Sequence, residues 1–313
     1  MSSEVRRAAQ ILRAGGLVAF PTETVYGLGA DASNAKAVSR LYAVKRRPAT
    51  HPVIIHFASP KDALSWASGV PESAHQLAKR CWPGPLTLIL KRSPLAQDFV
   101  TGGQTTVGLR VPSHPVAQQL LQEFAGGIAA PSANRFGRVS PTTAAHVRED
   151  LGQDVDQVLE GAAGEVGIES TILDLSSGAP VLLRPGHVSR EELKRILKSE
   201  ILDPTSASPR HSGGLERHYA PRTPARLVPT HALDREISAL KERVAVLAFS
   251  RPDERVDYWL RMPREPQGYA RRLYAALREL DTAGCERILV EAPPESAEWS
   301  AVRDRLKRAC EQA

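Results

Sequence analysis

Leu17-Val18-Ala19-Phe20 runs directly into Pro21-Thr22-Glu23-Thr24-Val25-Tyr26-Gly27-Leu28-Gly29. The first four residues form an apolar run of strand length, and Pro21 ends strand pairing because it lacks a backbone donor. The two glycines are expected to permit positive φ where the backbone must come close to a ligand. Two hydroxyls, a carboxylate and a phenol therefore follow the end of a strand, which is typical of a binding loop rather than a plain turn.

The composition indicates a globular protein with room for two domains. The chain has 313 residues, of which 42% are hydrophobic and 24% are charged, so each domain can bury its own core and no disordered or fibrous class is indicated. The formal net charge of +6 suits an anionic ligand such as a nucleotide. It is too small to establish nucleic-acid binding, and ordinary solubility charge explains it equally well.

The cysteines and the N-terminal segment indicate the compartment. Cys81, Cys285 and Cys310 lie far apart and form no C-x-x-C pair, which argues against a disulfide framework and a zinc cluster. Residues 2–12 mix charged with apolar side chains, and no run of about 18 apolar residues could span a bilayer. We therefore expect a soluble protein of the reduced cytoplasm with no membrane association.

Hydrophobic periodicity predicts alternating helices and strands through the first 200 residues. Helices are predicted over 5–12, 35–45, 72–81, 116–124, 142–150 and 190–198. Strands are predicted over 17–20, 53–57, 86–90, 107–111, 127–130, 170–174 and 180–183. The last two strands are joined by Ser176-Ser177-Gly178-Ala179 and predict a hairpin, so we expect a mixed sheet rather than a purely parallel one.

A change of composition divides the chain. Residues 201–224 are rich in Pro, Ser, Gly, Arg and His and predict a linker between a first domain, 1–200, and a second domain, 225–313. The second domain is expected to be a small parallel α/β domain with crossover helices. Its elements are strands over 226–228, 244–249 and 288–291, and helices over 269–280 and 301–310.

A basic cluster and a single arginine in a strand are candidates for binding an anion. Lys45-Arg46-Arg47-Pro48 would ordinarily be a solvated cluster, but Pro48 ends the helix and His51-Pro52 precede an apolar strand. A guanidinium there can hold a phosphate through two parallel hydrogen bonds. Arg110 lies inside an apolar strand, where a buried charge needs either a protein carboxylate or a ligand as partner. The sequence leaves both partners open.

Polar residues also follow the strand that ends at residue 130. Pro131-Ser132-Ala133-Asn134 comes directly after this strand, and Ser140 is expected to open the next helix as a capping hydroxyl. The N-terminus of a helix is an anion site, although an ordinary N-cap explains Ser140 as well. Turn chemistry accounts for Glu169-Ser170-Thr171 and for Gly186, but it gives no reason for Arg184.

Competing nucleotide and hydrolase motifs are absent. The sequence contains no G-x-x-x-x-G-K-[ST], no G-x-S-x-G and no H-E-x-x-H. The segment 27–32 formally fits G-x-G-x-x-A, but the strand ends at Phe20 and the next helix starts only near Asn34. The tight strand-turn-helix of a dinucleotide fold is therefore missing.

Taken in order from Thr22 to Arg184, these motifs resemble the threonylcarbamoyl-adenylate synthase family, Sua5/YrdC/TsaC. The segment His218-Tyr219-Ala220-Pro221 resembles the H-Y-A-P of its long, two-domain form, whereas Ser212-Gly213-Gly214-Leu215 departs from the S-P-G-M of many members. The resemblance implies a YrdC-like twisted mixed sheet with flanking helices, plus a smaller Rossmann-like parallel α/β domain.

The resemblance also implies an activity. L-Threonine, bicarbonate or CO2 and ATP would become threonylcarbamoyl-AMP and pyrophosphate, a nucleotidyltransferase reaction that supplies the modification of adenosine 37 in tRNA. Mg²⁺ would arrive with ATP, and no protein residue is assigned as a metal ligand. A contact with tRNA and delivery of the product to a threonylcarbamoyl transferase are further expectations. Residues 202–224 are predicted to act as a lid, because a carbamate is unstable in water.

Site residues carried over from the resemblance fall into two groups. Those implied to contact threonine are Thr24, His56, Arg110, the backbone at Ala130, and Ser170. Those implied to contact ATP are Lys45, Arg47, His51, Thr106, Ser132, Asn134, Ser140, Arg184, His218 and Tyr219. Lys45 and Arg47 are also expected to be catalytic, by offsetting the charge of the polyphosphate.

Two alternatives come from other classes. The basic balance also suits a module that binds double-stranded RNA or tRNA, although hydroxyl pairs and an in-strand arginine favour a small-molecule pocket. A carbamoyl-transfer accessory domain of the hydrogenase-maturation type is the other alternative, but such chains carry zinc-finger and acylphosphatase segments that this sequence lacks.

Overall fold

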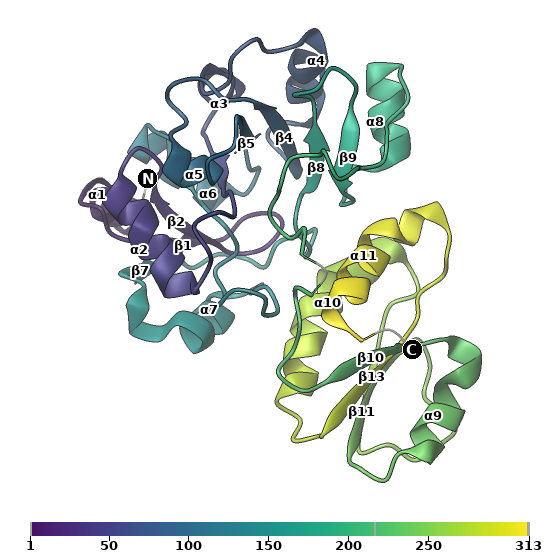
Figure 1. Ribbon diagram of the computed structural model, residues 1–313. Coiled ribbons are helices and arrows are strands. Elements are labelled where there is room, and N and C mark those ends of the chain that lie inside the picture. Colours follow the sequence, from purple (N-terminus) through teal and green to yellow (C-terminus); the bar gives the residue numbers. More distant parts are fainter. Residues whose placement is uncertain (1, 216, 312–313) are drawn as a thin grey trace. The chain divides into compact units, whose positions relative to one another are not determined.

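The computed structural model describes residues 2–215 and 217–311 and divides into two compact units (Figure 1). Unit 1 comprises Met1–Phe136 and Pro141–Gly214. Unit 2 comprises Gly137–Ser140 and Leu215–Ala313. The linker predicted over 201–224 is therefore shared, since its residues up to Gly214 pack with unit 1 and the later ones with unit 2.

Unit 1 is built on a nine-stranded mixed sheet, which confirms the predicted sheet type. The strand order is β7-β1-β2-β6-β3-β5-β4-β8-β9. β1 pairs antiparallel with β2, β3 pairs parallel with β5, and β8 and β9 form the predicted antiparallel hairpin. The strands are β1 (Val18–Phe20), β2 (Gly27–Asp31), β3 (Ile54–His56), β4 (Leu86–Lys91), β5 (Thr106–Arg110), β6 (Ile128–Ala129), β7 (Gln157–Val158), β8 (Thr171–Asp174) and β9 (Val181–Arg184).

Helices cover the two faces of this sheet unequally. They are α1 (Ser3–Arg13), α2 (Ala35–Lys45), α3 (Pro60–Ser65), α4 (Glu72–Cys81), α5 (Asp98–Thr101), α6 (Pro115–Phe124), α7 (Ala144–Leu151) and α8 (Arg190–Leu197), with a short 3₁₀ turn at Gly152–Asp154. One face packs against the apolar sides of α2, α4, α7 and α8 in the main core. On the other face, α1 and α6 pack only near β1 and β6.

The part of the second face away from α1 and α6 carries the candidate site. A separate apolar cluster lies there, formed by Ile54, Ile89, Ile172, Val181 and Leu183. Because side chains alternate along a strand, the residues two positions after Ile54 and two before Ile89 point to this same face. His56 and Thr87 occupy those positions, and the parallel register pairs His56 with Arg110.

Three expectations about local structure were wrong. Gly27 and Gly29 lie in β2, not in a loop, and neither has positive φ. Gly29 is required for packing instead, since a Cβ there would approach Phe20 Cε1 and Ile128 Cγ2 at 2.9 Å. Ser140 does not cap a helix, because α7 begins later.

The true N-cap of α7 is Thr143, whose hydroxyl accepts a hydrogen bond from the His146 amide. A site role for Ser140 therefore cannot rest on the dipole of this helix.

Unit 2 contains a four-stranded parallel sheet in the order β10-β13-β11-β12, which confirms the predicted parallel domain. Its strands are β10 (Ala225–Val228), β11 (Val244–Ala248), β12 (Tyr258–Arg261) and β13 (Arg287–Glu291). Its helices are α9 (Leu233–Ala239), α10 (Pro266–Asp281) and α11 (Ser300–Ala309), with 3₁₀ turns at Thr230–Ala232 and Ala297–Trp299. β12 and α9 were not predicted from the sequence.

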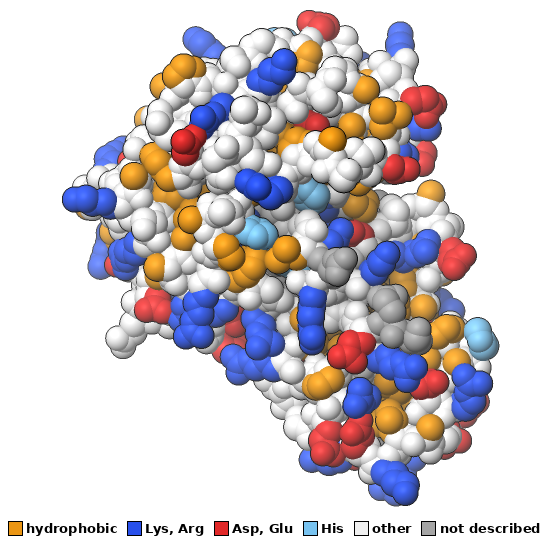
Figure 2. All heavy atoms as spheres, in the orientation of Figure 1, with side chains coloured by type: hydrophobic (Ala, Val, Ile, Leu, Met, Phe, Trp, Pro, Cys, Tyr) orange, Lys and Arg blue, Asp and Glu red, His pale blue; other side chains and the backbone are white. Residues whose placement is uncertain are grey.

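Charge is mixed on the face of unit 2 that Figure 2 draws, where basic and acidic side chains are interspersed. A one-sign stripe, the usual electrostatic mark of a nucleic-acid surface, is not seen on that face. Among the described residues, no helix is both long and apolar enough to cross a bilayer.

Candidate active site

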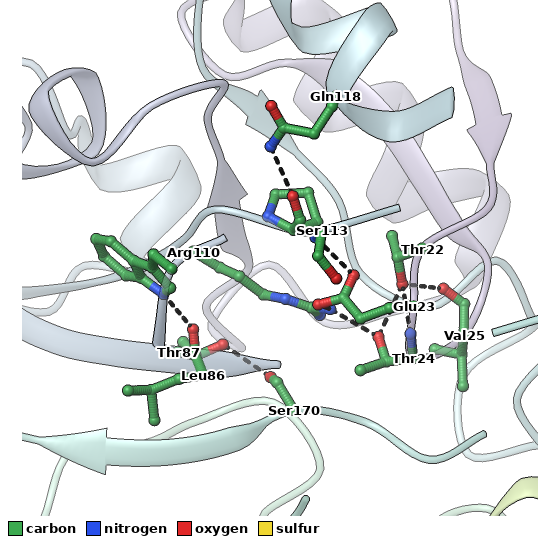
Figure 3. A network of polar contacts seen from close by, with 12 residues as sticks. Thr22, Glu23, Thr24, Val25, Leu86, Thr87, Arg110, Ser113, Gln118 and Ser170 are labelled. Atoms are coloured by element: carbon green, nitrogen blue, oxygen red, sulfur yellow. Dashed lines mark hydrogen bonds and ion pairs between the residues drawn. The ribbon is translucent and has the colours of Figure 1, made fainter. Parts of the chain in front are cut away.

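The loop between β1 and β2 is held by its own hydroxyls (Figure 3). The Thr22 hydroxyl donates to the Val25 carbonyl at 2.6 Å and lies 2.8 Å from the Thr24 hydroxyl. The Thr24 amide in turn donates to the Thr22 hydroxyl at 3.2 Å. Side-chain bonds of this kind fix a tight turn, so the polar side chains of the loop are buried in defined positions.

Arg110, at the end of β5, forms a buried ion pair with Glu23 of this loop. Arg110 Nη2 donates to Glu23 Oε1 at 2.7 Å and to the Thr24 hydroxyl at 2.9 Å. The Ser113 amide donates to the second oxygen of Glu23 at 3.1 Å. The two charged side chains are only 5% and 8% exposed. The sequence left the partner of Arg110 open, and Glu23 is the protein carboxylate that fills this role.

Arg110 nevertheless keeps a donor for a ligand. Its buried Nε has no hydrogen-bond partner among the described residues. A buried donor without a partner is costly, and such groups are usually satisfied by a ligand or by water. The guanidinium can therefore accept a second anion while its contact with Glu23 remains.

His56 lies beside Arg110 in the neighbouring strand and is neutral. Burial and the positive charge of Arg110 lower the pKa of His56 to about 3. Its ring packs edge-on against Phe20 with centroids 6.3 Å apart, and its Nδ1 has no partner in the described part of the chain. A neutral imidazole next to a cation adds no repulsion to a bound anion and offers one further polar atom.

Ser170, just before β8, contacts Thr87 of β4 and Arg184 of β9. The hydroxyls of Ser170 and Thr87 lie 2.8 Å apart, as Figure 3 shows. Arg184 Nε donates to the Ser170 carbonyl at 3.0 Å, and Arg184 Nη2 donates to the Ser170 hydroxyl at 3.2 Å. The structure thus gives Arg184 a defined place, fixed by backbone and hydroxyl contacts.

Lys45, the last residue of α2, holds the loop that follows β6. Its Nζ donates to the carbonyls of Ser132 and Asn134, while the Phe136 amide donates to the Lys45 carbonyl at 2.8 Å. Ala130, at the start of this loop, donates its amide to the Ile54 carbonyl at 3.0 Å. Lys45 therefore positions the segment that the family resemblance assigns to ATP.

The surroundings of Lys45 also disfavour the charged form of its amine. Its side chain is almost fully buried, and burial followed by repulsion from Arg47 lowers the pKa of Lys45 well below its ordinary value. A bound polyanion would counteract the lowering of this pKa, because an opposite charge stabilises the ammonium form.

Arg47 lies against the backbone that leads into β3. Its Nη2 donates to the Pro52 carbonyl at 2.7 Å, and its guanidinium lies 5.4 Å from the centre of the Phe136 ring. His51 packs edge-on against the same ring, and burial together with Arg47 lowers the pKa of His51. Lys45, Arg47 and His51 are therefore brought together around the segment 132–136.

Ser212 of the linker contacts two of the predicted phosphate ligands. Arg184 Nη1 donates to the Ser212 carbonyl at 2.9 Å, and Arg47 Nη2 contacts the Ser212 hydroxyl at 3.3 Å. Arg210, two residues before Ser212, is bound at its backbone by the Gln104 side chain. The Arg210 amide donates to Gln104 Oε1 at 2.8 Å, and Gln104 Nε2 donates to the Arg210 carbonyl at 3.0 Å. The linker thus covers the site and offers oxygens to both arginines.

Little space remains beneath this part of the linker. A cavity of about 10 Å³ is lined by Thr106 and Gly108 of β5, by neighbouring apolar residues and by the linker residues 210–212. This is about the room that one water molecule needs. A nucleotide could enter here only if the linker moved.

Three predicted ATP contacts lie in unit 2. Ser140 belongs to the segment Gly137–Ser140, and His218 and Tyr219 lie in the second half of the linker. All three are buried, and Tyr219 has a positive φ of 62°.

The sequence reasoning did not identify four residues of the site. Glu23 was quoted only as part of a motif, although a carboxylate close to a required cation was a usable signal. Ser212 was likewise quoted only as part of a linker segment. Thr87 and Gln104 had no local signal, because their partners lie far away in the chain.

The described residues contain no group of three or more His, Cys, Asp or Glu side chains placed to hold a metal ion. The donors that surround Ser212 are cations, which bind phosphate oxygens directly. Such cationic donors suit the oxygens of a polyphosphate.

The sequence matches two families of domains. Residues 10–186 match the Sua5/YciO/YrdC family, described as telomere recombination. Residues 188–310 match the C-terminal domain of threonylcarbamoyl-AMP synthase.

Curated relatives match along the whole chain. The threonylcarbamoyl-AMP synthase of Pyrococcus abyssi is 40% identical, with 98% of this chain and 94% of that protein covered. The threonylcarbamoyl-AMP synthase of Bacillus subtilis is 37% identical, with 98% and 92% covered.

A solved structure agrees with these matches. The crystal structure of P. abyssi Sua5 complexed with L-threonine superposes with a TM-score of 0.91 at 37% identity, covering 99% of this chain and 96% of that one. The chain therefore belongs to the Sua5/YciO/YrdC family and carries the C-terminal domain of the threonylcarbamoyl-AMP synthases.

Proposed function

We propose that the protein is an L-threonylcarbamoyladenylate synthase. It would convert L-threonine, bicarbonate and ATP into threonylcarbamoyl-AMP, pyrophosphate and water. The adenylyl group is transferred to an oxygen of the carbamate that threonine and CO2 form, so the enzyme would be a nucleotidyltransferase. The product would supply the threonylcarbamoyl group to adenosine 37 of tRNA through a separate transferase, and the reaction would take place in the cytoplasm, where these substrates occur.

One observation carries the proposal at the amino-acid end of the site. Arg110 is buried, already positioned by Glu23 and Thr24, and keeps Nε without a partner in the described residues. A carboxylate meets this requirement through a charge-assisted hydrogen bond. The threonine carboxylate would bind there, with the Ser170 hydroxyl and neutral His56 as neighbouring polar groups.

The arginines that contact Ser212 would bind the phosphates of ATP. Arg47 and Arg184 contact the oxygens of Ser212, and these are the positions that phosphate oxygens would take when the linker moves. Lys45 holds the loop at Ser132 and Asn134, which with His51 and Thr106 complete the unit 1 residues proposed for ATP. Mg²⁺ bound to the polyphosphate would offset part of its charge.

The chemistry needs positioning more than it needs a nucleophilic side chain. The threonine amine, after losing a proton, forms a C–N bond with CO2 and releases a second proton, which gives a carbamate. A carbamate oxygen then attacks the α-phosphorus, the bond to the β-phosphate oxygen breaks, and pyrophosphate leaves. Holding two anions in line and neutralising their charge lowers this barrier, which assigns catalysis to Lys45 and Arg47.

The test is release of pyrophosphate from ATP by the full chain, with threonine or bicarbonate omitted in turn. We expect release only when both are present, and mass spectrometry should detect threonylcarbamoyl-AMP. Equal release without threonine, or formation of ADP instead of AMP derivatives, would refute the proposed function. The variant Arg80→Met is a matched control, because it removes an exposed arginine of α4.

A further inference from the structure

Four residues of the loop after β6 are built into unit 2. The Ala220 amide donates to the Gly137 carbonyl at 2.9 Å, and Arg138 Nη1 donates to the Pro221 carbonyl at 3.3 Å. Arg138 and Ala220 also form a parallel β-bridge. The segment Gly137–Ser140 therefore lies strand-like beside the H-Y-A-P segment.

Arg278 of α10 fixes the end of this segment. Its Nη2 donates to the Val139 carbonyl at 2.6 Å, and its Nε donates to the Ser140 carbonyl at 3.4 Å. Val139 is 3% exposed and Ser140 is 0% exposed, so water cannot readily replace the guanidinium at these carbonyls. A planar fork that binds two successive carbonyls sets the direction of the backbone between them.

The same turn of α10 also binds the backbone that directly follows the H-Y-A-P segment. Asp281, three residues after Arg278, accepts hydrogen bonds from the amides of Arg222 at 2.9 Å and Thr223 at 2.7 Å. The end of α10 therefore holds two chain segments at once, and each carries predicted ATP contacts.

Side chains of α10 and α11 fix Tyr219 in turn. The Tyr219 ring lies 5.7 Å from the ring of Tyr274 and 5.4 Å from the guanidinium of Arg305, which is completely buried. The His218 amide donates to the Arg308 carbonyl at 3.0 Å. These contacts hold Tyr219 in a left-handed backbone conformation that a non-glycine residue adopts only under constraint.

We propose that Arg278 is a positioning residue for the nucleotide. Through the Val139 and Ser140 carbonyls it fixes Ser140, so that the Ser140 hydroxyl meets ATP in one orientation. The inference rests on the proposed function in taking ATP as the ligand, and on the family resemblance in taking the Ser140 hydroxyl as one of its contacts. It gives unit 2 a specific task, which is to hold the nucleotide-contacting segments in place.

The test compares Arg278→Lys with Arg272→Lys in the full chain. Arg272 is exposed on the same helix, so its variant controls for the change of side chain. Lysine keeps the charge but cannot bind both carbonyls as a fork. We expect the KM for ATP to rise about tenfold in Arg278→Lys, the value for one lost charged hydrogen bond. The KM for threonine should change less than twofold, and the control should equal the parent chain.

A double-mutant cycle shows whether Arg278 acts through Ser140. Ser140→Ala removes the hydroxyl but keeps the carbonyl that Arg278 binds. If the inference holds, adding Arg278→Lys to Ser140→Ala raises the KM for ATP less than twofold further. Additive tenfold effects would overturn it, as would an equal rise in both KM values.

Folding and binding are measured in parallel. Thermal unfolding of each variant is recorded, with Arg278→Gln as a second substitution that keeps a donor. Loss of the fold in both variants would assign Arg278 a structural role and overturn the inference.

Calorimetric titration with MgATP alone separates the two proposals. If the parent chain binds MgATP but releases no pyrophosphate, the proposed function fails while the affinity of Arg278→Lys still decides the inference. Unchanged affinity in that variant, or no MgATP binding by the parent chain, overturns the inference.

Discussion

Arg110 Nη2 and Glu23 Oε1 lie 2.7 Å apart in a buried ion pair, and none of the residues that the structure describes binds Arg110 Nε. Glu23 comes from the loop after β1 and Arg110 from the end of β5, so the pair fixes the loop against the sheet. Its worth for stability is small in net terms, since burying two charges is costly. Its main effect is to aim a guanidinium, and the following predictions begin there.

Arg110→Met should weaken threonine binding by about 30- to 1000-fold, the cost of a charge-assisted contact of about 2–4 kcal/mol. Arg47→Met should instead weaken ATP binding by a similar factor. Calorimetric titration of each ligand separately checks both variants, with Arg80→Met as control. A swapped pattern would show that the two arginines have the opposite roles.

Arg110→Met is also expected to lose stability, and a second substitution can offset this loss. Arg110→Met leaves Glu23 buried without its partner, which costs about 3–5 kcal/mol of stability. The double variant Glu23→Gln, Arg110→Met should regain much of this stability yet still bind threonine poorly. Recovery of threonine binding in the double variant would contradict the role of Arg110.

The pKa of His56 makes stability depend on acid pH. The folded pKa is about 3, below the ordinary 6.5, so the unfolded chain binds more protons between these values. Stability is fully present above pH 6.5 and falls as the pH drops towards 3. His56 alone should remove about 2 kcal/mol between pH 6.5 and pH 4.5.

Urea unfolding, monitored by tryptophan fluorescence, gives the free energy of unfolding of His56→Asn and of the parent chain at both pH values. The variant should lose about 2 kcal/mol less than the parent on acidification. His75→Asn, at an exposed position of α4, is the matched control. Equal losses in His56→Asn and in the parent would show that His56 does not titrate in this way.

ATP binding should take up protons through Lys45. Burial and Arg47 lower the pKa of Lys45 in the chain without ligand, and a polyphosphate raises it again. At a pH above the lowered pKa and below the ordinary lysine value, the neutral amine should therefore become protonated as ATP binds. Calorimetry in two buffers of different ionisation enthalpy measures the uptake.

Lys45→Met should abolish that proton uptake, and Lys79→Met, an exposed lysine, should not. Proton release on ATP binding, or uptake that survives in Lys45→Met, would place the titrating group elsewhere.

Gln104→Ala should free the linker. The two hydrogen bonds between Gln104 and the Arg210 backbone contribute about 1–3 kcal/mol together, so the detached state should become about 5- to 150-fold more populated. Tryptic cleavage after Arg210 should then accelerate. ATP should bind more tightly because Ser212 competes less for Arg47 and Arg184.

The closed linker is also expected to protect the carbamate, so turnover of Gln104→Ala should fall even as ATP affinity rises. Gln76→Ala, exposed on α4, serves as control. If cleavage rate, affinity and turnover all remain at the parent values, the linker is only a tether.

Periodicity predicted most elements because most of them are amphipathic. α2 was predicted with its observed bounds, since its apolar residues recur at helical spacing and Asn34 caps it. β2 was missed because Gly27-Leu28-Gly29 has no strand propensity. Pairing with β1 and β6 imposes its strand conformation, and local sequence carries no record of that pairing.

The site residues, like the strands, could be predicted only where the local sequence carried a signal. Single residues such as Arg110 stood out because a charge in an apolar strand demands a partner. The partners themselves did not, since Glu23 lies 87 residues from Arg110, Thr87 lies 83 from Ser170, and Gln104 lies 106 from Arg210. Only the folded sheet and the returning linker bring them together.

The contact between Arg278 and Val139 spans 139 residues and has a consequence for synthesis. Ribosomes deliver the N-terminal part of a chain first, and domains fold as they emerge. Residues 137–140 leave the ribosome long before α10 exists to hold them. Unit 1 can therefore fold while residues 137–140 still lack their hydrogen bonds to Arg278. In a nascent or prematurely terminated chain without α10, nothing holds Ser140 in one position. By the proposed role of Arg278, tight ATP use would begin only after α10 has been translated.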